Sequence, residues 1–516
     1  MASSKMASGG HNIRPVRSIL DSDLYKFTMQ QAILLSTLED PPVSYRFTNR
    51  SKNMKFTRRC VEQIQRCIDG LSQLALSDEE RNWLATRCPY FREEYLSHLA
   101  QFRFRPKEQV ELRFVPDSDD EGRGDIELSV QGKWSEVILY EVPLMSIVSE
   151  MYFRIVDTDW KMEGQRTLAK EKARRLVKAG IRFSEFGSRR RRSYDSHKYC
   201  IEGLMAGQAQ EESAAAHAAS SSSSIANEGF SAPSQPSTAG ALGKLLGTSN
   251  VHFAQLYDLT PMGTVAHEWT MAIAALEGYD HANLNSLQYW DQVYSSPSFV
   301  PNSPAHDLTI ALTDTFSTSV FFGDLLSTNE GKEIAKRWRG LRQDSGDSKA
   351  FAWRARDVYN GLGVDPRSKV VIYSDGLDVD RCVDLQEYSR EIGIGAGFGI
   401  GTFLTNDFRQ STPSPDDLQD PDGPPPSSDL PVSKPLNIVI KLSTVKDRAA
   451  VKISDELTKN TGDAHEIEMV KRRFGLTQEA MENGDQPAGV TGQEETVVKV
   501  GRRQGEEDDK VPVEDA

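Results

Sequence analysis

The strongest constraint on the fold is a regular alternation of strand-like and helix-like runs that begins at residue 181. The helix-like runs lie between short apolar segments, for example over 332–339, 349–360 and 379–392. Such alternation is typical of a parallel sheet, and this many repeats favours a barrel over an open sheet. Because the spacing is uneven, the pattern predicts an irregular (β/α) barrel over residues 181–470. The strand-like runs are Ile181–Phe186, Val251–Leu256, Leu308–Thr313, Val370–Tyr373, Gly393–Gly401 and Ile438–Leu442.

The preceding region, residues 18–180, mixes helix-like segments with strand-like runs that are separated by short turns. Its strands alternate apolar and polar residues, which is typical of an antiparallel or mixed sheet with one covered face. We therefore expect an α/β protein with an additional N-terminal α+β domain. The strand-like runs of this domain are Val43–Asn49, Val110–Val115, Ile126–Val130 and Val137–Val142.

Four stretches lack the composition of a packed core. Residues 1–17 have no apolar run and are predicted to form a flexible leader. Residues 208–241 are rich in alanine and serine, residues 411–434 are acidic and proline-rich, and residues 483–516 form a polar, acidic end. Segments of this kind bury too little apolar surface to fold alone. They are predicted to be disordered insertions and a disordered tail.

Charge and cysteine content exclude several classes of function. The 516 residues carry a net charge of -14, which disfavours a general nucleic-acid-binding role. The five cysteines fit no zinc site or disulfide framework, which indicates a reducing compartment. No run of about 18 apolar residues is present, so no ordinary transmembrane helix is expected. These features predict a cytoplasmic protein with possible access to the nucleus and no membrane partner.

One histidine lies at a sharp corner in the chain. His267 follows the run Val251–Leu259, which we interpret as a strand, and a turn at Pro261, and it opens the helix-like run 268–276. A strand, a turn with glycine and then a helix often hold a reactive side chain at the end of a sheet. Most histidines in soluble chains are surface or core residues, so the corner alone carries little weight.

Polar turns follow several of the predicted barrel strands, at the end where barrel active sites lie. Arg189–Arg192 suit phosphate oxygens, or else form a solvated loop or a basic localisation patch. The run from Gly399 to Thr402 suits a phosphate cradle, or else close backbone packing. Asp344 and Asp347 suit ribose hydroxyls or Mg²⁺, or else cap the helix that begins near Ser348. Together these turns predict a phosphorylated, polyhydroxylated substrate.

Seven short motifs follow one another along the chain: Asp21–Met29, Tyr45–Phe47, Glu185–Arg190, Gly263–Glu268, Arg342–Asp347, Ser374–Asp378 and Gly399–Thr402. In this order they resemble the motifs of the nicotinate phosphoribosyltransferases, a family of type II phosphoribosyltransferases. The resemblance extends from about Ser18 to Asp463, and the opening motif and the histidine corner are the most similar.

The resemblance implies a reaction that joins nicotinate to 5-phosphoribosyl-1-pyrophosphate, giving nicotinate mononucleotide and pyrophosphate in NAD salvage. It implies that ATP hydrolysis is coupled through a phosphohistidine at His267, with Mg²⁺ present, and that the fold is an α/β domain plus an irregular barrel.

The resemblance also implies roles for individual residues. Nicotinate is expected on Tyr25, Thr264 and Arg342, although Tyr25 could equally be an ordinary helix residue. Asp344 is expected beside the ribose, Arg189 and Arg190 at the pyrophosphate, and Asp344 with Asp347 as candidate Mg²⁺ ligands. The 5-phosphate and ribose are expected on Ser374, Asp375, Gly376, Gly401 and Thr402.

Several alternatives stay open at this point. The base could be nicotinamide or quinolinate, or the chain could be a non-catalytic nucleotide-sensing relative. Against the sensor, each matched position holds a chemically competent residue. A carrier that passes phosphate from His267 to another protein would leave the ribose and phosphate residues without a purpose. The sequence leaves both a monomer and a homodimer open.

Overall fold

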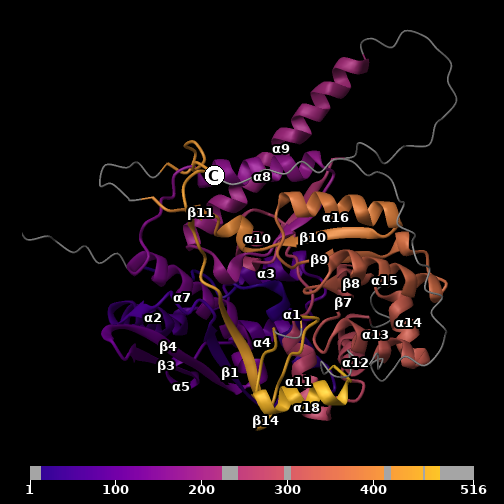
Figure 1. Ribbon diagram of the computed structural model, residues 1–516, viewed down its shortest axis with the longest axis horizontal. Coiled ribbons are helices and arrows are strands. Elements are labelled where there is room, and N and C mark those ends of the chain that lie inside the picture. Colours follow the sequence, from indigo (N-terminus) through magenta and orange to yellow (C-terminus); the bar gives the residue numbers. More distant parts are fainter. Residues whose placement is uncertain (1–12, 224–241, 296–303, 412–419, 457–458, 477–516) are drawn as a thin grey trace, which may run out of the picture.

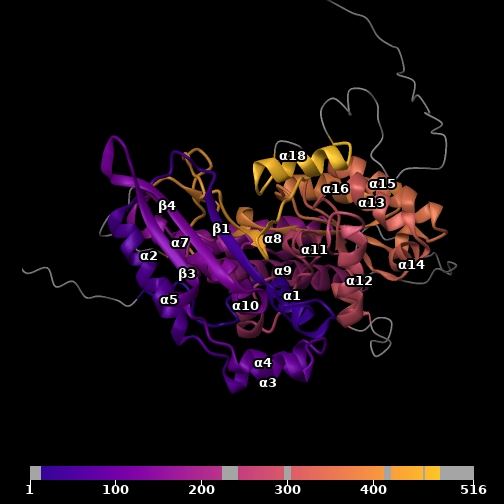
Figure 2. The same ribbon diagram turned by 90° about the horizontal axis from the view of Figure 1, so that it is seen from below.

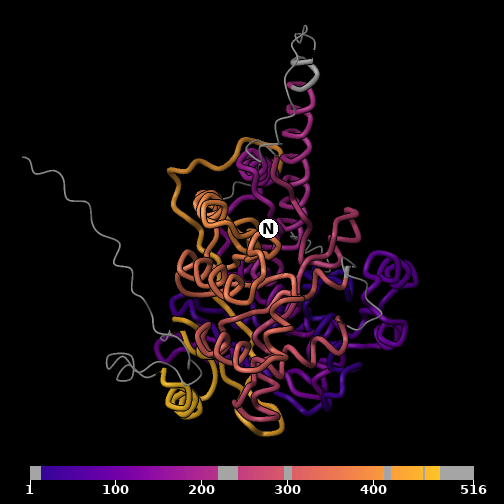
Figure 3. The backbone as a smooth tube through the Cα atoms, turned by 90° about the vertical axis from the view of Figure 1, so that its right-hand side faces the viewer, coloured from indigo at the N-terminus to yellow at the C-terminus, as the bar shows by residue number. Residues whose placement is uncertain are grey.

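The computed structural model describes residues 13–223, 242–295, 304–411, 420–456 and 459–476. Two sheets organise these residues (Figures 1 and 2). A long antiparallel sheet with β1, β3 and β4 lies on one side, with α2 and α5 beside it. A parallel sheet with its helices lies on the other side, and α9 extends away from the body of the protein (Figure 3). The expected combination of an antiparallel α+β part and a parallel α/β part is therefore confirmed.

The antiparallel sheet has six strands, in the order β14-β13-β1-β4-β2, with β3 paired to β4. In β1 (Pro42–Asn49) the side chains of Val43, Tyr45 and Phe47 are buried and alternate with more exposed ones, as expected for a sheet with one covered face. The other strands are β2 (Phe56–Thr57), β3 (Val110–Asp117), β4 (Asp120–Lys133), β13 (Ile438–Val445) and β14 (Arg448–Ala449).

One strand predicted for the barrel belongs to this antiparallel sheet instead. β13 pairs antiparallel with β1 along its whole length, from Val43 opposite Val445 to Asn49 opposite Ile438. The side chains of Ile438, Ile440 and Leu442 are buried. The chain thus returns to its N-terminal part, and the alternation of parallel strands and helices ends at β10 (Gly395–Ile400).

The parallel sheet has six strands, in the order β6-β5-β10-β9-β8-β7, and all five pairings are parallel. In the described part of the chain, the end strands β6 and β7 do not pair with each other. A closed barrel is therefore not confirmed and stays a prediction. The strands are β5 (Arg182–Glu185), β6 (Lys244–Thr248), β7 (Ile310–Leu312), β8 (Gly340–Gln343), β9 (Val370–Tyr373) and β10 (Gly395–Ile400).

The predicted strand Val251–Leu259 is wrong, because this segment begins with helix α10 (Val251–Leu256). The side chain of Asn250 caps the helix by accepting a hydrogen bond from the backbone N–H of Phe253. Val251, Phe253 and Ala254 are buried whereas Leu256 is exposed, which is a helical rather than an alternating pattern. The strand before the histidine corner is β6.

The disorder predicted for the two insertions is wrong wherever the structure describes their residues. Residues 208–223 continue helix α9 (Tyr194–Ser223), so that part of the first disorder prediction is wrong. Residues 420–434 are also placed: Gly164 N–H donates to Asp420 C=O at 3.0 Å, and β12 (Val432–Ser433) pairs with β11 (Phe408–Arg409). Residues 224–241 and 412–419 lie outside the described residues.

The two chain ends give different results. Within the predicted leader, Val16 is buried and the carbonyl of Pro15 accepts a hydrogen bond from Arg191 at 2.7 Å, so residues 13–17 are held against the protein. Residues 1–12 and the predicted tail, 483–516, lie outside the described residues.

The remaining helices cover the two sheets. Among the described residues, no helix has the length and apolar character needed to cross a membrane. The helices are α1 (Leu24–Leu35), α2 (Arg58–Gly70), α3 (Asp78–Arg87), α4 (Glu93–Gln101), α5 (Pro106–Gln109), α6 (Trp134–Val137), α7 (Glu141–Ile155), α8 (Gln165–Lys178), α11 (His267–Glu277), α12 (Ala282–Tyr294), α13 (Thr318–Ser327), α14 (Asn329–Arg337), α15 (Ser348–Gly361), α16 (Val379–Ile392), α17 (Thr402–Thr405) and α18 (Ala464–Arg473).

Candidate active site

The candidate site lies where the strands of the parallel sheet end. Asp314 follows β7, Asp344 follows β8, Ser374 follows β9 and Gly401 follows β10. Because neighbouring parallel strands finish at the same edge, residues far apart in the chain meet there. His267 joins them as the first residue of α11.

His267 is buried and has polar partners at both ring nitrogens. Its Nδ1 lies 3.1 Å from Thr315 Oγ1, and its Nε2 lies 3.1 Å from Asp344 Oδ2 and 2.9 Å from Lys452 Nζ. Burial, and then the charge of Lys452, lower the pKa of His267 to about 4, although Asp314 and Asp344 oppose the shift. The imidazole is therefore neutral at physiological pH and can act as a nucleophile.

Arg342 and Ser374 hold Asp344 from the other side. Arg342 Nη2 lies 3.1 Å from Asp344 Oδ1, and Ser374 Oγ donates to the same oxygen at 2.6 Å. Arg342 Nε also donates to Ser374 Oγ at 2.9 Å. Burial alone would raise the pKa of Asp344, but Arg342, His267 and Lys452 together hold it well below its usual range. Asp344 is thus an ionised carboxylate beside a neutral imidazole.

Two residues of this cluster, Asp314 and Lys452, were absent from the predicted set. Asp314 Oδ2 accepts hydrogen bonds from Ser345 Oγ at 2.6 Å and from Lys452 Nζ at 3.1 Å. Asp314 Oδ1 is buried without a hydrogen-bond partner among the described residues, 3.8 Å from His267 Nε2. A sequence signal existed for Asp314, which directly follows a predicted strand. Lys452 lies in a stretch without any recognised motif.

The third residue missing from the predicted set is Lys441 of β13. Burial lowers the pKa of its ammonium to about 8, and the charge of Lys452 acts in the same direction. Glu141 and Asp344 oppose the shift. The strand that left the predicted barrel therefore brings a lysine into the electrostatic surroundings of the site.

The four consecutive arginines divide into two pairs. Arg189 Nη1 lies 3.5 Å from Glu141 Oε1, and its guanidinium lies 5.9 Å from the Tyr25 ring centre. Arg190 is half-buried and donates to the carbonyl of Ile438 at 2.9 Å. The other two are fully buried in the core: Arg191 pairs with Asp21 at 2.8 Å, and Arg192 donates to Asn406 and Ser433. Because Arg191 and Arg192 are buried in the core, the predicted phosphate-binding role can apply only to Arg189 and Arg190.

The three residues expected to hold the base come from three parts of the chain: α1, the segment before α11, and β8. Thr264 and Arg342 both line a cavity of about 620 Å³ along the parallel sheet, which Phe186 and Phe398 also line. Tyr25 is in α1, whose Thr28 hydroxyl donates to the carbonyl of Thr264 at 3.0 Å. Tyr25 is buried and its hydroxyl lies 3.3 Å from Glu141 Oε2. All three belong to one chain.

The remaining predicted residues are less closely linked to His267. Asp347 is exposed and caps α15, accepting from the backbone N–H groups of Lys349 and Ala350 at 2.8 and 3.0 Å, so the capping interpretation applies to it. Asp375 and Thr402 are half-buried at the ends of β9 and β10. Gly376 has φ 56°, a left-handed conformation that favours glycine, and Gly401 precedes the short helix α17.

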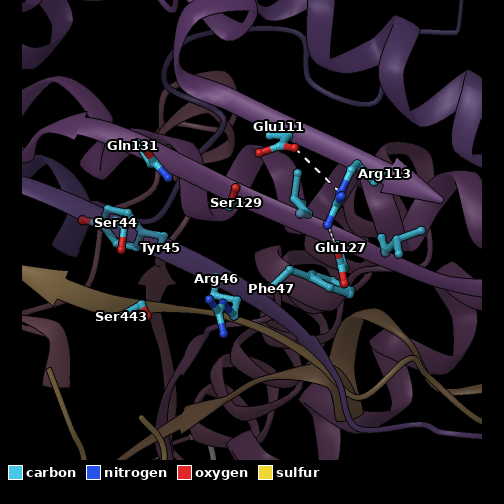
Figure 4. A pocket seen from close by; sticks show the side chains of 12 residues that line it. Ser44, Tyr45, Arg46, Phe47, Glu111, Arg113, Glu127, Ser129, Gln131 and Ser443 are labelled. Atoms are coloured by element: carbon cyan, nitrogen blue, oxygen red, sulfur yellow. Dashed lines mark hydrogen bonds and ion pairs between the residues drawn. The ribbon is translucent and has the colours of Figure 1, made fainter. Parts of the chain in front are cut away.

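A second cavity, of about 450 Å³, lies on the antiparallel sheet (Figure 4). It is lined by the motif Tyr45–Phe47, and three of its charged side chains pair with one another: Arg113 contacts both Glu111 and Glu127. Apart from that motif it contains none of the predicted site residues. We therefore place the active site at the ends of the parallel strands.

The fold and the site together define a class of protein. A neutral histidine, an ionised aspartate and several arginines and lysines at the carboxyl ends of parallel strands are typical of an α/β enzyme that acts on phosphorylated substrates.

Comparison with known proteins identifies the family. Residues 181–478 match the nicotinate phosphoribosyltransferase (NAPRTase) family profile, and residues 20–149 match the profile of the NAPRTase N-terminal domain. The chain belongs to the nicotinate phosphoribosyltransferase family.

Individual relatives match along nearly their whole length. The chain is 40% identical over 463 residues to the probable nicotinate phosphoribosyltransferase of Schizosaccharomyces pombe, covering 89% of this chain and 98% of the relative. It is 34% identical to the nicotinate phosphoribosyltransferase of Saccharomyces cerevisiae, covering 92% and 98%. A crystal structure of the Porphyromonas gingivalis enzyme of that name superposes with a TM-score of 0.69 at 30% identity, covering 89% and 99%.

Proposed function

We propose that this protein joins nicotinate to 5-phosphoribosyl-1-pyrophosphate and releases nicotinate mononucleotide and pyrophosphate. The observation that carries the proposal is the cluster of His267, Asp344 and Arg342 in a chain of this family, in which Asp344 contacts both of the other residues. Curated relatives are named for this activity. The proposal places the enzyme in NAD salvage, in the cytoplasm with access to the nucleus.

The base is assigned as nicotinate because the cavity offers a guanidinium to a carboxylate. Arg342 is 15% exposed at its side chain and lines the cavity together with Thr264. A guanidinium fork binds a carboxylate with two parallel hydrogen bonds, which the amide of nicotinamide cannot match in charge. Quinolinate has a second carboxylate and would require a further cation beside Arg342. Other cations that line the cavity, such as Arg182 and Arg339, lie at the opposite, amino ends of the strands.

The ribosyl transfer itself requires stabilisation of two developing charges. As the bond from ribose to pyrophosphate breaks, the ribose gains oxocarbenium character, as in other glycosyl transfers. Asp344 supplies an ionised carboxylate for this cation. Arg189 and Arg190 supply charge for the leaving pyrophosphate, which needs stabilisation as it departs.

ATP enters the proposal through His267. The neutral imidazole attacks the γ-phosphorus of ATP, a bond from nitrogen to phosphorus forms, and ADP leaves with the electron pair of the broken P–O bond. Water later attacks the same phosphorus and releases phosphate. The charges of Lys452 and Arg342 nearby offset the charge that the phosphoryl group brings to the site.

Mg²⁺ also fits the site, although one of its two carboxylate ligands differs from the predicted pair. Among the described residues, no group of three or more histidine, cysteine, aspartate or glutamate side chains is arranged to hold a metal ion. Mg²⁺ usually binds one or two carboxylates together with waters and substrate phosphates. Asp344 and the unpartnered Oδ1 of Asp314 provide such a pair, whereas Asp347 caps a helix. When bound, Mg²⁺ would neutralise pyrophosphate charge.

The proposal is tested by mixing the protein with Mg²⁺, 5-phosphoribosyl-1-pyrophosphate and nicotinate, with and without ATP, and measuring mononucleotide and ADP together. We expect ATP to increase mononucleotide formation, and we expect His267→Ala to lose that response. If turnover is independent of ATP and is unchanged in His267→Ala, the transferase activity stands but the phosphohistidine mechanism is refuted. Ligand binding without turnover would favour the nucleotide-sensing alternative.

A further inference from the structure

The two ring nitrogens of His267 have different kinds of partner. On the Nδ1 side, the Thr315 hydroxyl can donate or accept a hydrogen bond at 3.1 Å. On the Nε2 side, Lys452 Nζ at 2.9 Å can only donate, whereas Asp344 Oδ2 at 3.1 Å can only accept. The partner that dominates on the Nε2 side therefore determines which ring nitrogen carries the proton.

Of the two possible hydrogen bonds at Nε2, we expect the one from Lys452 to dominate over the one to Asp344. Its ammonium, which has donors and no acceptor, is also paired with Asp314 Oδ2 at 3.1 Å. Asp344 does not depend on the imidazole, because its Oδ1 already accepts from Arg342 and Ser374. With Lys452 donating to Nε2, the proton lies on Nδ1 and is donated to Thr315.

The position of Lys452 is fixed by its neighbours in the chain. Val451 and Ile453 are buried in an apolar cluster with Phe316, Ile467 and Phe474. The backbone N–H of Ile453 donates to the carbonyl of Thr315 at 2.8 Å. The segment that carries Lys452 is thus attached to the residue that faces the opposite nitrogen of the ring.

We propose that Lys452 is a positioning residue, which holds His267 as the Nδ1–H tautomer and directs phosphoryl transfer from ATP to Nε2. This inference rests on the ATP coupling of the proposed function and specifies which atoms react in the phosphoryl transfer. The Nε2 lone pair forms the bond to phosphorus, and the bond between the γ-phosphorus and the bridging oxygen breaks, with its electron pair leaving on ADP. Nδ1 keeps its proton throughout, so no proton has to move. Lys452, displaced from Nε2, then faces the new phosphoryl oxygens.

The tautomer can be measured without ATP by nitrogen NMR of protein containing isotope-labelled histidine, with His267 assigned from the spectrum of His267→Ala. We expect an unprotonated Nε2 in the wild type and a protonated Nε2, bonded to Asp344, in Lys452→Met. Lys452→Arg keeps a donor-only cation and should retain the wild-type tautomer. A wild-type spectrum with the proton on Nε2 would overturn the inference.

The direction of transfer is measured with radiolabelled ATP, an alkaline quench and separation of the two phosphohistidine isomers. We expect only the Nε2 isomer in the wild type, and a roughly tenfold or greater loss of phosphoenzyme in Lys452→Met. Lys459→Met, which removes an exposed lysine of the same segment, is the matched control and should behave as the wild type. Thermal unfolding of each variant shows whether it is folded.

The outcomes separate the inference from the function on which it rests. Two results would overturn the inference while leaving the ATP coupling intact. One is phosphorylation of the wild-type protein at Nδ1. The other is a Lys452→Met variant that is phosphorylated at Nε2 to the same level as the wild type. Absence of any phosphoenzyme in the wild type would refute the coupling itself and with it the direction of transfer, even if the NMR tautomer is as expected.

Discussion

Replacing Lys26 by methionine should destabilise the whole protein, because Lys26 is the cation of a fully buried network beside the active site. Its Nζ lies 2.6 Å from Glu141 Oε2 and also contacts Glu268. Glu268 follows His267 in α11 and accepts further hydrogen bonds from Tyr45 at 2.5 Å and Trp134 at 2.8 Å. The network thereby joins α1, β1, α6 and α7 to the helix that carries the histidine.

The expected magnitude follows from the burial of the three charges. Lys26 is 0% exposed, and its partners Glu141 and Glu268 are 7% and 8% exposed. Removing one partner of a buried ion pair costs about 3–5 kcal/mol, because an uncompensated charge stays buried. Methionine keeps most of the side-chain volume, so little of the loss comes from a cavity. Against a total stability of about 5–15 kcal/mol, the loss is large.

The assay is urea unfolding followed by circular dichroism, with Lys55→Met as the matched control. Lys55 also contacts two carboxylates, Asp117 and Asp125, but is 26% exposed, so its loss should cost less than about 1 kcal/mol. The double variant Lys26→Met with Glu268→Gln should recover part of the loss. The reasoning is refuted if Lys26→Met is no more destabilising than Lys55→Met.

Three further predictions concern recognition, acid stability and thiol reactivity. Arg342→Lys removes the guanidinium fork and should lower kcat/KM for nicotinate by roughly ten- to a hundredfold, measured by steady-state kinetics; unchanged kinetics would contradict its role. Burial alone would raise the pKa of Asp21, but Arg191 holds it at about 2, below its ordinary value of 3.8. The stabilisation that this carboxylate contributes is therefore present above about pH 3.8 and is lost as the pH falls through 2. Arg191→Met should shift the acid unfolding transition to higher pH. An unshifted transition would contradict this stabilising role of the ion pair. Burial raises the pKa of the Cys88 and Cys382 thiols to about 12, so both should react with a thiol reagent only after unfolding, and fast labelling of the folded protein would disprove this.

Local patterns in the sequence predicted the parts of the fold that depend on local contacts. β9 was predicted at its observed bounds, because four apolar residues lie between turn signals there. The helix α10 was mistaken for a strand, since its aromatic and apolar composition favours both and only the Asn250 cap distinguishes them. β13 was recognised as a strand, but its partner β1 lies almost four hundred residues away, and no local pattern encodes that pairing.

In the site too, local patterns predicted some residues, whereas others depend on contacts between distant parts of the chain. Asp344, Arg342 and Ser374 were predicted from the family motifs Arg342–Asp347 and Ser374–Asp378. Strand β8 (Gly340–Gln343), which contains Arg342 and which Asp344 follows, was not among the predicted strands. Only the family motif, which ends at Arg190, separated Arg189 and Arg190 from Arg191 and Arg192. The burial of the latter two depends on Asp21 and Asn406 from distant parts of the chain, which no local pattern encodes. Lys452 reaches His267 across 185 residues and has no motif around it, so only the structure could identify it.

The most direct test of the central claim is the choice of base. Purified protein with Mg²⁺, ATP and 5-phosphoribosyl-1-pyrophosphate should be given nicotinate, nicotinamide and quinolinate in parallel, with the mononucleotide products identified by mass spectrometry. A site built around Arg342 and Thr264 predicts rapid formation of nicotinate mononucleotide and little or no product from the other two bases. Preferential turnover of nicotinamide or quinolinate, or no turnover of any base, would contradict the account.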